Sequence, residues 1–485
     1  AGLAWSIARM AWTPAWTADD AFIVARYADH LAHHGQLAFN LGERPVEGVT
    51  GVFLVLVEAL AAGLGMQPAP VGVALGVVGL VVAAPLLWAI ARELRLAPLT
   101  SLALGLFYFG VPEHVVHARS GLETELYLAG SLACVWGLAR ALRRDEPRQG
   151  VLVVSAVLLS TLRPEGLVTG LLAMALVVAR HRRLDRRAAL FFLVPVLAVH
   201  AARFAYFGSL LPNTYYAKRT DHFTPLFLRD LRDVVGGYFG GALLVAAGVV
   251  LLHRLLVRPV APRADDRHAW VLAAGSSLLA VSIVAYGRAD LVMNYAHRFV
   301  VHLLPWLAVG CALIVDHAAR AASTFHARAE RAALGLLAAL AVVLAHGAAA
   351  DRLATERRFA PAYLALEAQH RAVAAALTQR LGPTATIACY PDAGVIPYET
   401  RLRTLDFGKL NDAYLAREAR TPAEVVSYFF RNAPDALVVS RLADTTRMFD
   451  AGADAILADP RFSAYEPAIV FAGEGEGLLL FFRKP

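Results

Sequence analysis

Long apolar stretches separated by short basic loops dominate the first 350 residues of the chain. Their apolar positions are continuous rather than alternating, and most stretches have about the 17–25 residues that an α-helix needs to cross a bilayer. Only helices and closed barrels satisfy their backbone groups in lipid, so this pattern predicts a bundle of membrane-spanning helices. The stretches are 49–66, 70–91, 97–112, 121–139, 149–161, 165–180, 188–205, 236–253, 269–286, 299–316 and 331–350.

The charge of the loops predicts the orientation of this bundle. Arginine clusters in the loops 91–95, 140–148, 180–187, 253–263 and 320–331, which the positive-inside rule places in the cytoplasm. All of them fall on one side only if the stretch 49–66, which contains Glu58, lies at the interface instead of crossing. Residues 1–12 then act as the end of a first span whose upstream part is missing. The outer side receives the loop 17–69 and the segments 112–121, 163–166, 206–235 and 287–298.

Residues 351–485 have a mixed composition of another kind. TATIACY, LRTLDF, ALVVS and GLLLFF predict short strands, whereas AYLALEAQHRAVAAALTQRLG and PAEVVSYFFRN predict amphipathic helices. The last apolar stretch leaves the cytoplasm, so this part is expected on the outer side. The predicted fold class is an α-helical polytopic membrane protein, residues 1–350, with a C-terminal soluble α/β domain, residues 351–485.

Composition supports a membrane protein and excludes several other classes. The chain is 58% hydrophobic and only 18% charged, with a mean hydropathy of +0.52, whereas a soluble domain is about half apolar and a quarter charged. The net charge of +7 lies in the loops without interleaved aromatic residues, so no nucleic-acid partner is expected. Cys134, Cys311 and Cys389 have no regular spacing, which gives no support to a zinc site or a disulfide framework.

Unusual polar residues concentrate in the predicted outer segments. Ionisable groups at a membrane face are costly unless they are paired or solvated, so by default they indicate a functional cavity. The candidates are Asp19, Asp20, Arg26, Asn40, Glu43 and Glu47 in the first loop, Glu123 in the second, Arg163 and Glu165 at the RPEG break, Asn213, Tyr216 and Lys218 in the next loop, and His297 and Arg298 in the last.

Some of these signals have a purely structural alternative. Asp19 and Asp20 follow Thr17 and precede a periodic stretch, so they could simply begin a helix and complement its dipole. Arg163 and Glu165 could serve as partners for polar groups freed by a proline kink. No GxGxxG or Walker pattern occurs, so no nucleotide site is predicted.

Ordered motifs over about residues 1–310 resemble those of the GT-C membrane glycosyltransferases, most of all the branch with the mycobacterial terminal arabinofuranosyltransferases. They are ADDAFIVARYADHLAHHGQLAFNLGERPVEGVT, SGLET, LRPEG, YFGSLLPNTYYAK and an HR pair before a helix, with PDAGVIPYETRLRTLDFGKLND as a looser match. The chain departs from the pattern at Pro45, which is inserted before the Val-Glu pair and puts the register of Glu43 and Glu47 in question.

The resemblance implies a sugar transferred from a polyprenyl-phosphate donor at the outer face of the bacterial inner (plasma) membrane. The acceptor is a hydroxyl on a cell-envelope glycan, lipid or protein. Asp19 or Asp20 acts as the general base, with a weak preference for Asp20, while Lys218, His297 and Arg298 hold the departing phosphate together with Arg163. Arg26, Glu43 and Glu47 shape the first loop.

Two points stay open at the level of the sequence. A divalent cation (Mg²⁺, Mn²⁺ or Ca²⁺) is left as a cofactor that the acids of the first two outer loops would hold. The main alternative function is a non-catalytic transporter or flippase of a lipid-linked sugar. Transporters usually have internal repeats and charges at mid-membrane, whereas this sequence has no detectable repeat and carries its charges in loops. A degenerate, non-catalytic relative is a further alternative, which the intact pair of aspartates opposes.

Overall fold

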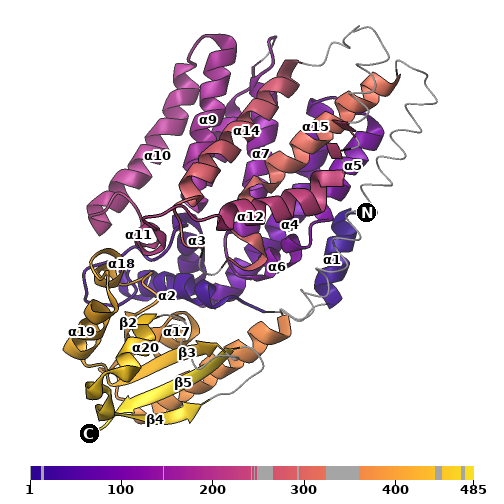
Figure 1. Ribbon diagram of the computed structural model, residues 1–485. Coiled ribbons are helices and arrows are strands. Elements are labelled where there is room, and N and C mark those ends of the chain that lie inside the picture. Colours follow the sequence, from indigo (N-terminus) through magenta and orange to yellow (C-terminus); the bar gives the residue numbers. More distant parts are fainter. Residues whose placement is uncertain are drawn as a thin grey trace.

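A helical bundle with a small sheet domain at one end forms the structure (Figure 1). This computed structural model describes residues 2–12, 16–145, 147–241, 243–244, 246–247, 266–291, 294–323, 360–442, 451–470 and 476–485. The predicted stretch 331–350 and the end of 236–253 lie outside these residues. The helical bundle and the C-terminal α/β domain were both expected from the sequence, and the structure confirms them.

Four helical segments of the described residues are long and apolar enough to cross a membrane. They are α4 (Pro68–Glu93), α10 (Arg186–Phe207), α14 (Asp266–Tyr286) and the segment Tyr295–Arg320, which includes most of α15 (Leu304–Ser323). A fifth span results if α5 (Pro98–Phe109) and α6 (Glu113–Arg119) are counted together, although the two helices are bent by 55°. The chain is therefore an integral membrane protein.

Small residues allow the central helices to pack closely. α7 (Thr124–Ala141) contacts α4 on one side and α8 (Gly150–Leu162) on the other, and α8 continues into α9 (Pro164–His181) after a break at Arg163. Side chains three or four positions apart share one face of a helix, and α4 places Gly72, Gly76 and Gly79 on such a buried face. A Cβ atom at Gly76 would lie 2.6 Å from the carbonyl oxygen of Ala118, so a larger residue there would push α6 away.

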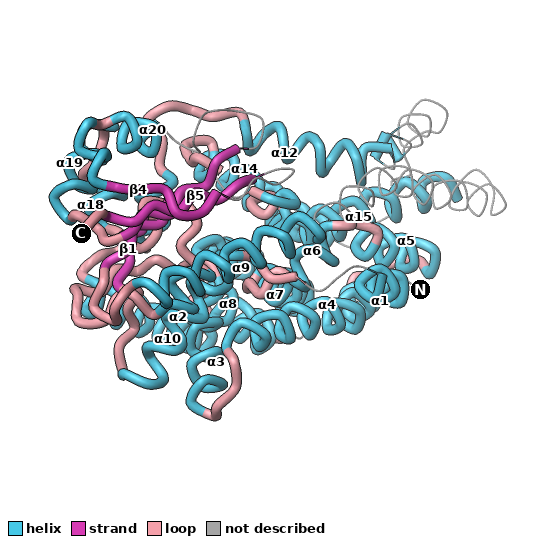
Figure 2. The backbone as a smooth tube through the Cα atoms, turned by 90° about the horizontal axis from the view of Figure 1, so that it is seen from below, coloured by secondary structure: helices cyan, strands magenta, loops and turns pink. Residues whose placement is uncertain are grey.

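The first loop, residues 17–69, forms two helices that are not among the candidate spans. α2 (Asp19–His34) runs along the end of the bundle beside the sheet domain (Figure 2). α3 (Val52–Gly63) has twelve residues, or about 18 Å of helix, against a hydrocarbon core of about 30 Å. Its length agrees with the interpretation that the stretch 49–66 does not cross the membrane.

The C-terminal domain contains one five-stranded sheet in the order β2-β1-β3-β5-β4. β1 (Thr386–Tyr390), β2 (Arg403–Asp406) and β3 (Ala436–Leu442) are parallel, whereas β5 (Glu476–Arg483) is antiparallel to both β3 and β4 (Tyr465–Val470). The sequence did not predict β4, because Pro467 and a break in register interrupt it; both are tolerated at the edge of a sheet. The helices are 360–380, α17 (Val395–Thr400), α18 (Ala413–Arg417), α19 (Pro422–Asn432) and α20 (Ala451–Ala458).

The described parts of the basic loops, in 91–95, 140–148 and 180–187 and at Arg320, meet at the end of the bundle opposite the sheet domain (Figure 1). A cavity of about 500 Å³ there is lined by Arg95, Arg143, Arg144, Arg180, Arg267 and Arg320, together with Asp266 and Asp316. Several of the arginines that line it form ion pairs, such as Arg143 with Glu93 at 2.7 Å and Arg180 with Asp266 at 2.6 Å. The described basic residues and the C-terminal domain thus lie at opposite ends of the bundle.

The side of the membrane on which each end lies can be measured directly. We expect a cysteine placed at Arg183 to react only after the cells are permeabilised, and one placed at Glu418 to react with an impermeant maleimide in intact spheroplasts. Both residues are exposed, and the three native cysteines are buried. Labelling of both positions from the same side would contradict the predicted topology.

Candidate active site between the bundle and the sheet domain

A polar cavity of about 120 Å³ lies where the first loop, 17–69, meets the C-terminal domain. The membrane part contributes α2 and the end of α11 (Asn213–Lys218), and the C-terminal domain contributes the loops that follow β1 and β2. The charged residues that line the cavity are Asp19, Asp20, Lys218, Asp290, Asp392, Asp406 and Lys409. Segments distant in the sequence thus converge on one small, charged space.

The two adjacent aspartates of α2 have different surroundings. Asp19 is buried, and its carboxylate accepts hydrogen bonds from the backbone amides of Gly394 and Val395, both at 2.8 Å. Burial raises the pKa of Asp19 to about 6, against the opposing effect of the nearby His370. A Cβ atom at Gly394 would lie 1.9 Å from the backbone oxygen of Asp19, so only glycine permits this contact. Asp19 therefore docks the C-terminal domain.

Asp20 faces the cavity with a more accessible side chain. Consecutive helical residues point about 100° apart, which separates its carboxylate from that of Asp19. Its side chain is 17% exposed, and its Oδ2 lies 2.8 Å from Nη1 of Arg298. The residue before α2 is Ala18, so no side chain caps the first turn of this helix by a hydrogen bond. The geometry favours Asp20 over Asp19 as the group that could meet a substrate.

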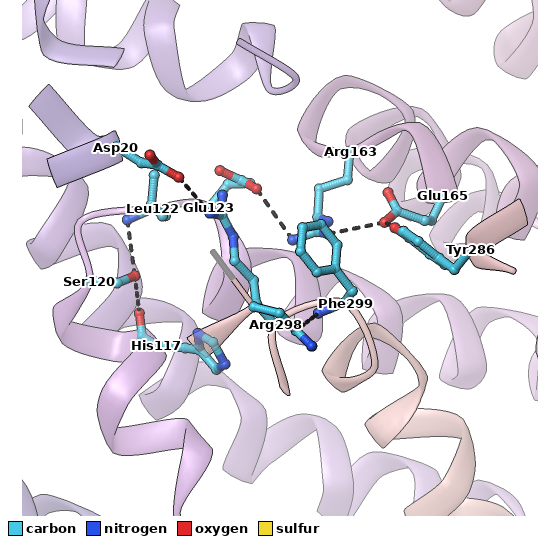
Figure 3. A network of polar contacts seen from close by, with 11 residues as sticks. Asp20, His117, Ser120, Leu122, Glu123, Arg163, Glu165, Tyr286, Arg298 and Phe299 are labelled. Atoms are coloured by element: carbon cyan, nitrogen blue, oxygen red, sulfur yellow. Dashed lines mark hydrogen bonds and ion pairs between the residues drawn. The ribbon is translucent and has the colours of Figure 1, made fainter. Parts of the chain in front are cut away.

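A chain of alternating cations and carboxylates extends from Asp20 into the bundle (Figure 3). Arg163 lies 3.5 Å from Glu123 and 3.0 Å from Glu165, which also accepts a hydrogen bond from the hydroxyl of Tyr286. Arg163 is buried at the break between α8 and α9, whose existence depends on Pro164. The helix break predicted at RPEG is therefore present, and its arginine pairs with Glu123 of the loop before α7 as well as with Glu165.

A tight turn presents Glu123 to this network. The hydroxyl of Ser120 donates to the carbonyl oxygen of His117 at 3.0 Å and accepts from the amide of Leu122 at 3.3 Å (Figure 3). Gly121 between them has a φ of +77°, a conformation that residues with a Cβ atom rarely adopt. The SGLET motif thus has a structural reason: its first three residues make the turn that carries Glu123.

Lys218 completes a group of three cations. It lines the cavity at the end of α11, and its Nζ lies 4.8 Å from the centre of the Phe299 ring. Burial and the positive charge of Arg298 lower the pKa of Lys218 to about 8. His297, in contrast, is directed at two other acids, with ring nitrogens 3.8 Å from Glu113 and 3.8 Å from Asp230. The structure therefore groups Lys218 with Arg298 and Arg163, while His297 has other partners.

Several other predicted site residues hold the two domains together. The guanidinium of Arg26 donates to the carbonyl oxygens of Phe39, Pro397 and Leu402. Asn40 accepts from the amide of Thr404 at 3.0 Å and donates to its carbonyl oxygen at 2.9 Å. These two residues join the first loop to the segment around β2 and do not line the cavity.

The remaining candidates have similar roles. Glu43 forms an ion pair with Arg403 at 2.6 Å, and Glu47 forms one with Arg203 of α10 at 2.6 Å. Both acids have partners in spite of the insertion of Pro45. The side-chain amide of Asn213 donates to three backbone carbonyls of residues 409–412, and the guanidinium of Arg417 lies 4.4 Å from the ring centre of Tyr216.

The sequence reasoning missed the residues that the C-terminal domain adds to the cavity. Tyr390 and Asp392 end or follow β1, and Asp406 and Lys409 end or follow β2. The looser motif match PDAGVIPYETRLRTLDFGKLND contains Asp392, Asp406 and Lys409. The sequence pattern that could have revealed them is an acidic residue at or just after the end of a predicted strand. Ligands of α/β sheets bind at the carboxyl ends of parallel strands.

The acids proposed for a divalent cation face basic groups. Asp20 pairs with Arg298, Glu123 with Arg163, and Glu125 of the second loop with His114 at 2.9 Å. In the part of the chain that the structure describes, no three His, Cys, Asp or Glu side chains are gathered as metal ligands. Each of these three acids thus has a basic partner in this arrangement.

Comparisons with known proteins bear on the fold. Residues 361–478 match a domain family of unknown function, DUF8728, and no curated protein matches the chain. The crystal structure of ArnT from Cupriavidus metallidurans bound to undecaprenyl phosphate, a GT-C protein, superimposes over 99% of this chain and 96% of its own, with a TM-score of 0.57 and 13% identity. The chain has the GT-C fold.

Two further solved structures are similar to this chain. The apo form of the same ArnT covers 96% of this chain and 93% of its own, with a TM-score of 0.54 and 12% identity. A cryo-EM structure of the arabinofuranosyltransferase AftD from Mycobacteria covers the whole chain but only 39% of its own, with a TM-score of 0.48 and 14% identity. The predicted GT-C fold class is confirmed by the ArnT structures, which extend over the bundle and the sheet domain alike.

Proposed function

We propose that this GT-C protein transfers a sugar from a polyprenyl-phosphate donor to an acceptor hydroxyl at the outer face of the bacterial inner membrane. The observation that supports this most is the cavity that Asp20 and Lys218 line, with Arg298 paired to the Asp20 carboxylate at 2.8 Å. A base and two cations are what the transfer requires, since the acceptor loses a proton while the donor releases a phosphate. The ArnT structure of the same fold holds undecaprenyl phosphate, a lipid of this class.

In the proposed reaction the acceptor oxygen forms a bond with the anomeric carbon of the donor sugar. The bond between that carbon and the phosphate oxygen breaks, and its electrons stay with the polyprenyl phosphate. Asp20 takes the proton of the acceptor hydroxyl, which prevents a positive charge from building up on the attacking oxygen.

The cations act on the leaving group. Arg298 and Lys218 attract the phosphate as its negative charge grows, and Arg163 supports them from the bundle side. Arg298 also forms the ion pair with Asp20 at 2.8 Å. A bound phosphate would compete for this guanidinium and leave the Asp20 carboxylate free to act as a base. The acceptor is a glycan, a lipid or a protein, since each can present a hydroxyl group.

A reconstitution assay tests the proposal against the transporter alternative. We expect the purified protein in liposomes to consume a polyprenyl-phosphate sugar and release polyprenyl phosphate in the presence of cell-envelope acceptors. The release is followed by mass spectrometry of the lipid fraction. Movement of intact donor between the two leaflets without its consumption would instead identify a flippase and contradict the transferase.

A further inference from the structure

The parallel strands of the C-terminal domain direct their carboxyl ends at the cavity. Tyr390 is the last residue of β1 and Asp406 the last of β2, and both line it. In the order β2-β1-β3, the strand that follows β1 in the sequence lies on one side of it, and β3 lies on the other side. Sheets of this kind bind ligands beyond the strand ends, near the point where the strand order reverses. Asp392 and Ser440 mark this point, where the hydroxyl of Ser440 donates to Asp392 at 2.8 Å.

Asp406 has an unused hydrogen-bond acceptor in this place. Its Oδ2 accepts from the backbone amide of Asn411 at 2.7 Å and from the side-chain amide of the same residue at 2.8 Å. Its Oδ1 is buried and has no hydrogen-bond partner among the described residues. Burial raises the pKa of Asp406 to about 7, although nearby amides oppose this effect. A buried carboxylate oxygen without a donor is destabilising, so a ligand that supplies an O–H group would relieve it.

The charge of the cavity indicates which part of a substrate lies here. The C-terminal side holds Asp392 and Asp406 against a single cation, Lys409, and this excess of acids disfavours an anion. The phosphate therefore belongs beside Lys218 and Arg298, and an uncharged group that donates hydrogen bonds fits beside Asp406. The rings of Tyr390 and Phe407, stacked with centres 5.5 Å apart, add apolar surface to the same wall. Acids next to aromatic rings suit a sugar, which has both hydroxyl groups and an apolar C–H face.

We propose that the strand ends of the C-terminal domain form a subsite for a sugar ring, in which Oδ1 of Asp406 accepts a hydrogen bond from one of its hydroxyl groups. This inference rests on the proposed glycosyl transfer and assigns a role to the DUF8728 region. The ring belongs to the donor or to the acceptor, and the two sources are separated by binding measurements. Asp406 thereby becomes a residue that determines specificity.

The test compares Asp406→Asn with Asp412→Asn in the full chain in lipid nanodiscs. Asparagine keeps the size of Asp406 and a contact with Asn411 but removes the charged acceptor. Asp412 is the matched control, because it bonds to Leu415 and Tyr428 in the same segment and does not line the cavity. The probes are undecaprenyl phosphate, its esters with a pentose and with a hexose, and the methyl glycosides of both sugars. Thermal melting monitors folding.

We expect Asp406→Asn to weaken sugar binding about 10-fold or more, the loss typical of a hydrogen bond to a charged group, with binding of bare undecaprenyl phosphate unchanged. Weaker binding of the sugar esters identifies the donor ring. Weaker binding of the methyl glycosides to lipid-loaded protein identifies an acceptor ring. The subsite is overturned if Asp406→Asn binds every probe like the wild type while the wild type binds the lipids. A wild type that binds no polyprenyl phosphate would overturn the proposed function, and the subsite with it.

Discussion

Replacing Asp20 with Asn is expected to lower sugar transfer by about 100- to 10,000-fold while the protein remains folded, because the change removes the proton acceptor. Asparagine has the same shape and retains a contact with Arg298, so the structure of the cavity should persist. The measurement is a single-turnover transfer assay with a polyprenyl-phosphate sugar, together with a melting curve in the same detergent.

Asp19→Asn provides the matched control for this prediction. Its carboxylate accepts hydrogen bonds from two backbone amides of the C-terminal domain, and asparagine has only one side-chain oxygen that can accept them. We therefore expect a loss of about 1–3 kcal/mol of stability at the domain contact and a smaller effect on the rate of transfer. Near-normal turnover of the Asp20 variant would remove its role as a base. A larger rate loss in the Asp19 variant at equal stability would identify Asp19 as the base and Asp20 as the structural residue.

Replacing Lys218 with Met is expected to weaken donor binding about 10- to 100-fold, because a charge-assisted contact to the phosphate is lost. Methionine is unbranched and apolar and suits the contact with Phe299, so little effect on folding is expected. The measurement is the binding of undecaprenyl phosphate to protein in nanodiscs. Arg219→Met, at the neighbouring exposed position, is the control and should change affinity less than about twofold.

The pH dependence of donor binding gives a second view of Lys218. Since the lowered pKa of this amine is about 8, it loses its charge as the pH rises through that value. Affinity for the lipid phosphate should therefore fall between about pH 7 and pH 9 in the wild type and fall less in Lys218→Met. Identical pH profiles in the two proteins would show that another group holds the phosphate.

The fold was predictable because its main signals are local. A continuous apolar stretch such as 70–91 needs no partner to reveal a helix, and it matches α4 closely. The strand predicted from TATIACY is equally visible in β1. β4 was not predicted, since an edge strand tolerates Pro467 and a break in register only because it pairs with β5. That pairing depends on the tertiary structure and leaves no periodic pattern in the sequence.

The site was predictable only in part, for a related physical reason. A polar residue in an apolar loop appears the same in the sequence whether it faces a substrate or another domain. Arg26 and Asn40 proved to bind backbone groups of the C-terminal domain, whereas Asp20 and Lys218 line the cavity. Asp406 lies nearly at the other end of the chain from Asp20, so the sequence alone could not bring the two together.

The contact of the C-terminal domain with α2 also determines when, during synthesis, the candidate active site can be fully assembled. Arg26 donates to the carbonyl oxygens of Pro397 and Leu402, which the ribosome adds long after α2. At a synthesis rate of about 5–20 residues per second, roughly 20–75 seconds separate the two events. Throughout this interval the polar groups of α2 depend on water or on a chaperone for partners. A nascent chain released before residue 397 would carry α2 without the carbonyl groups that Arg26 binds.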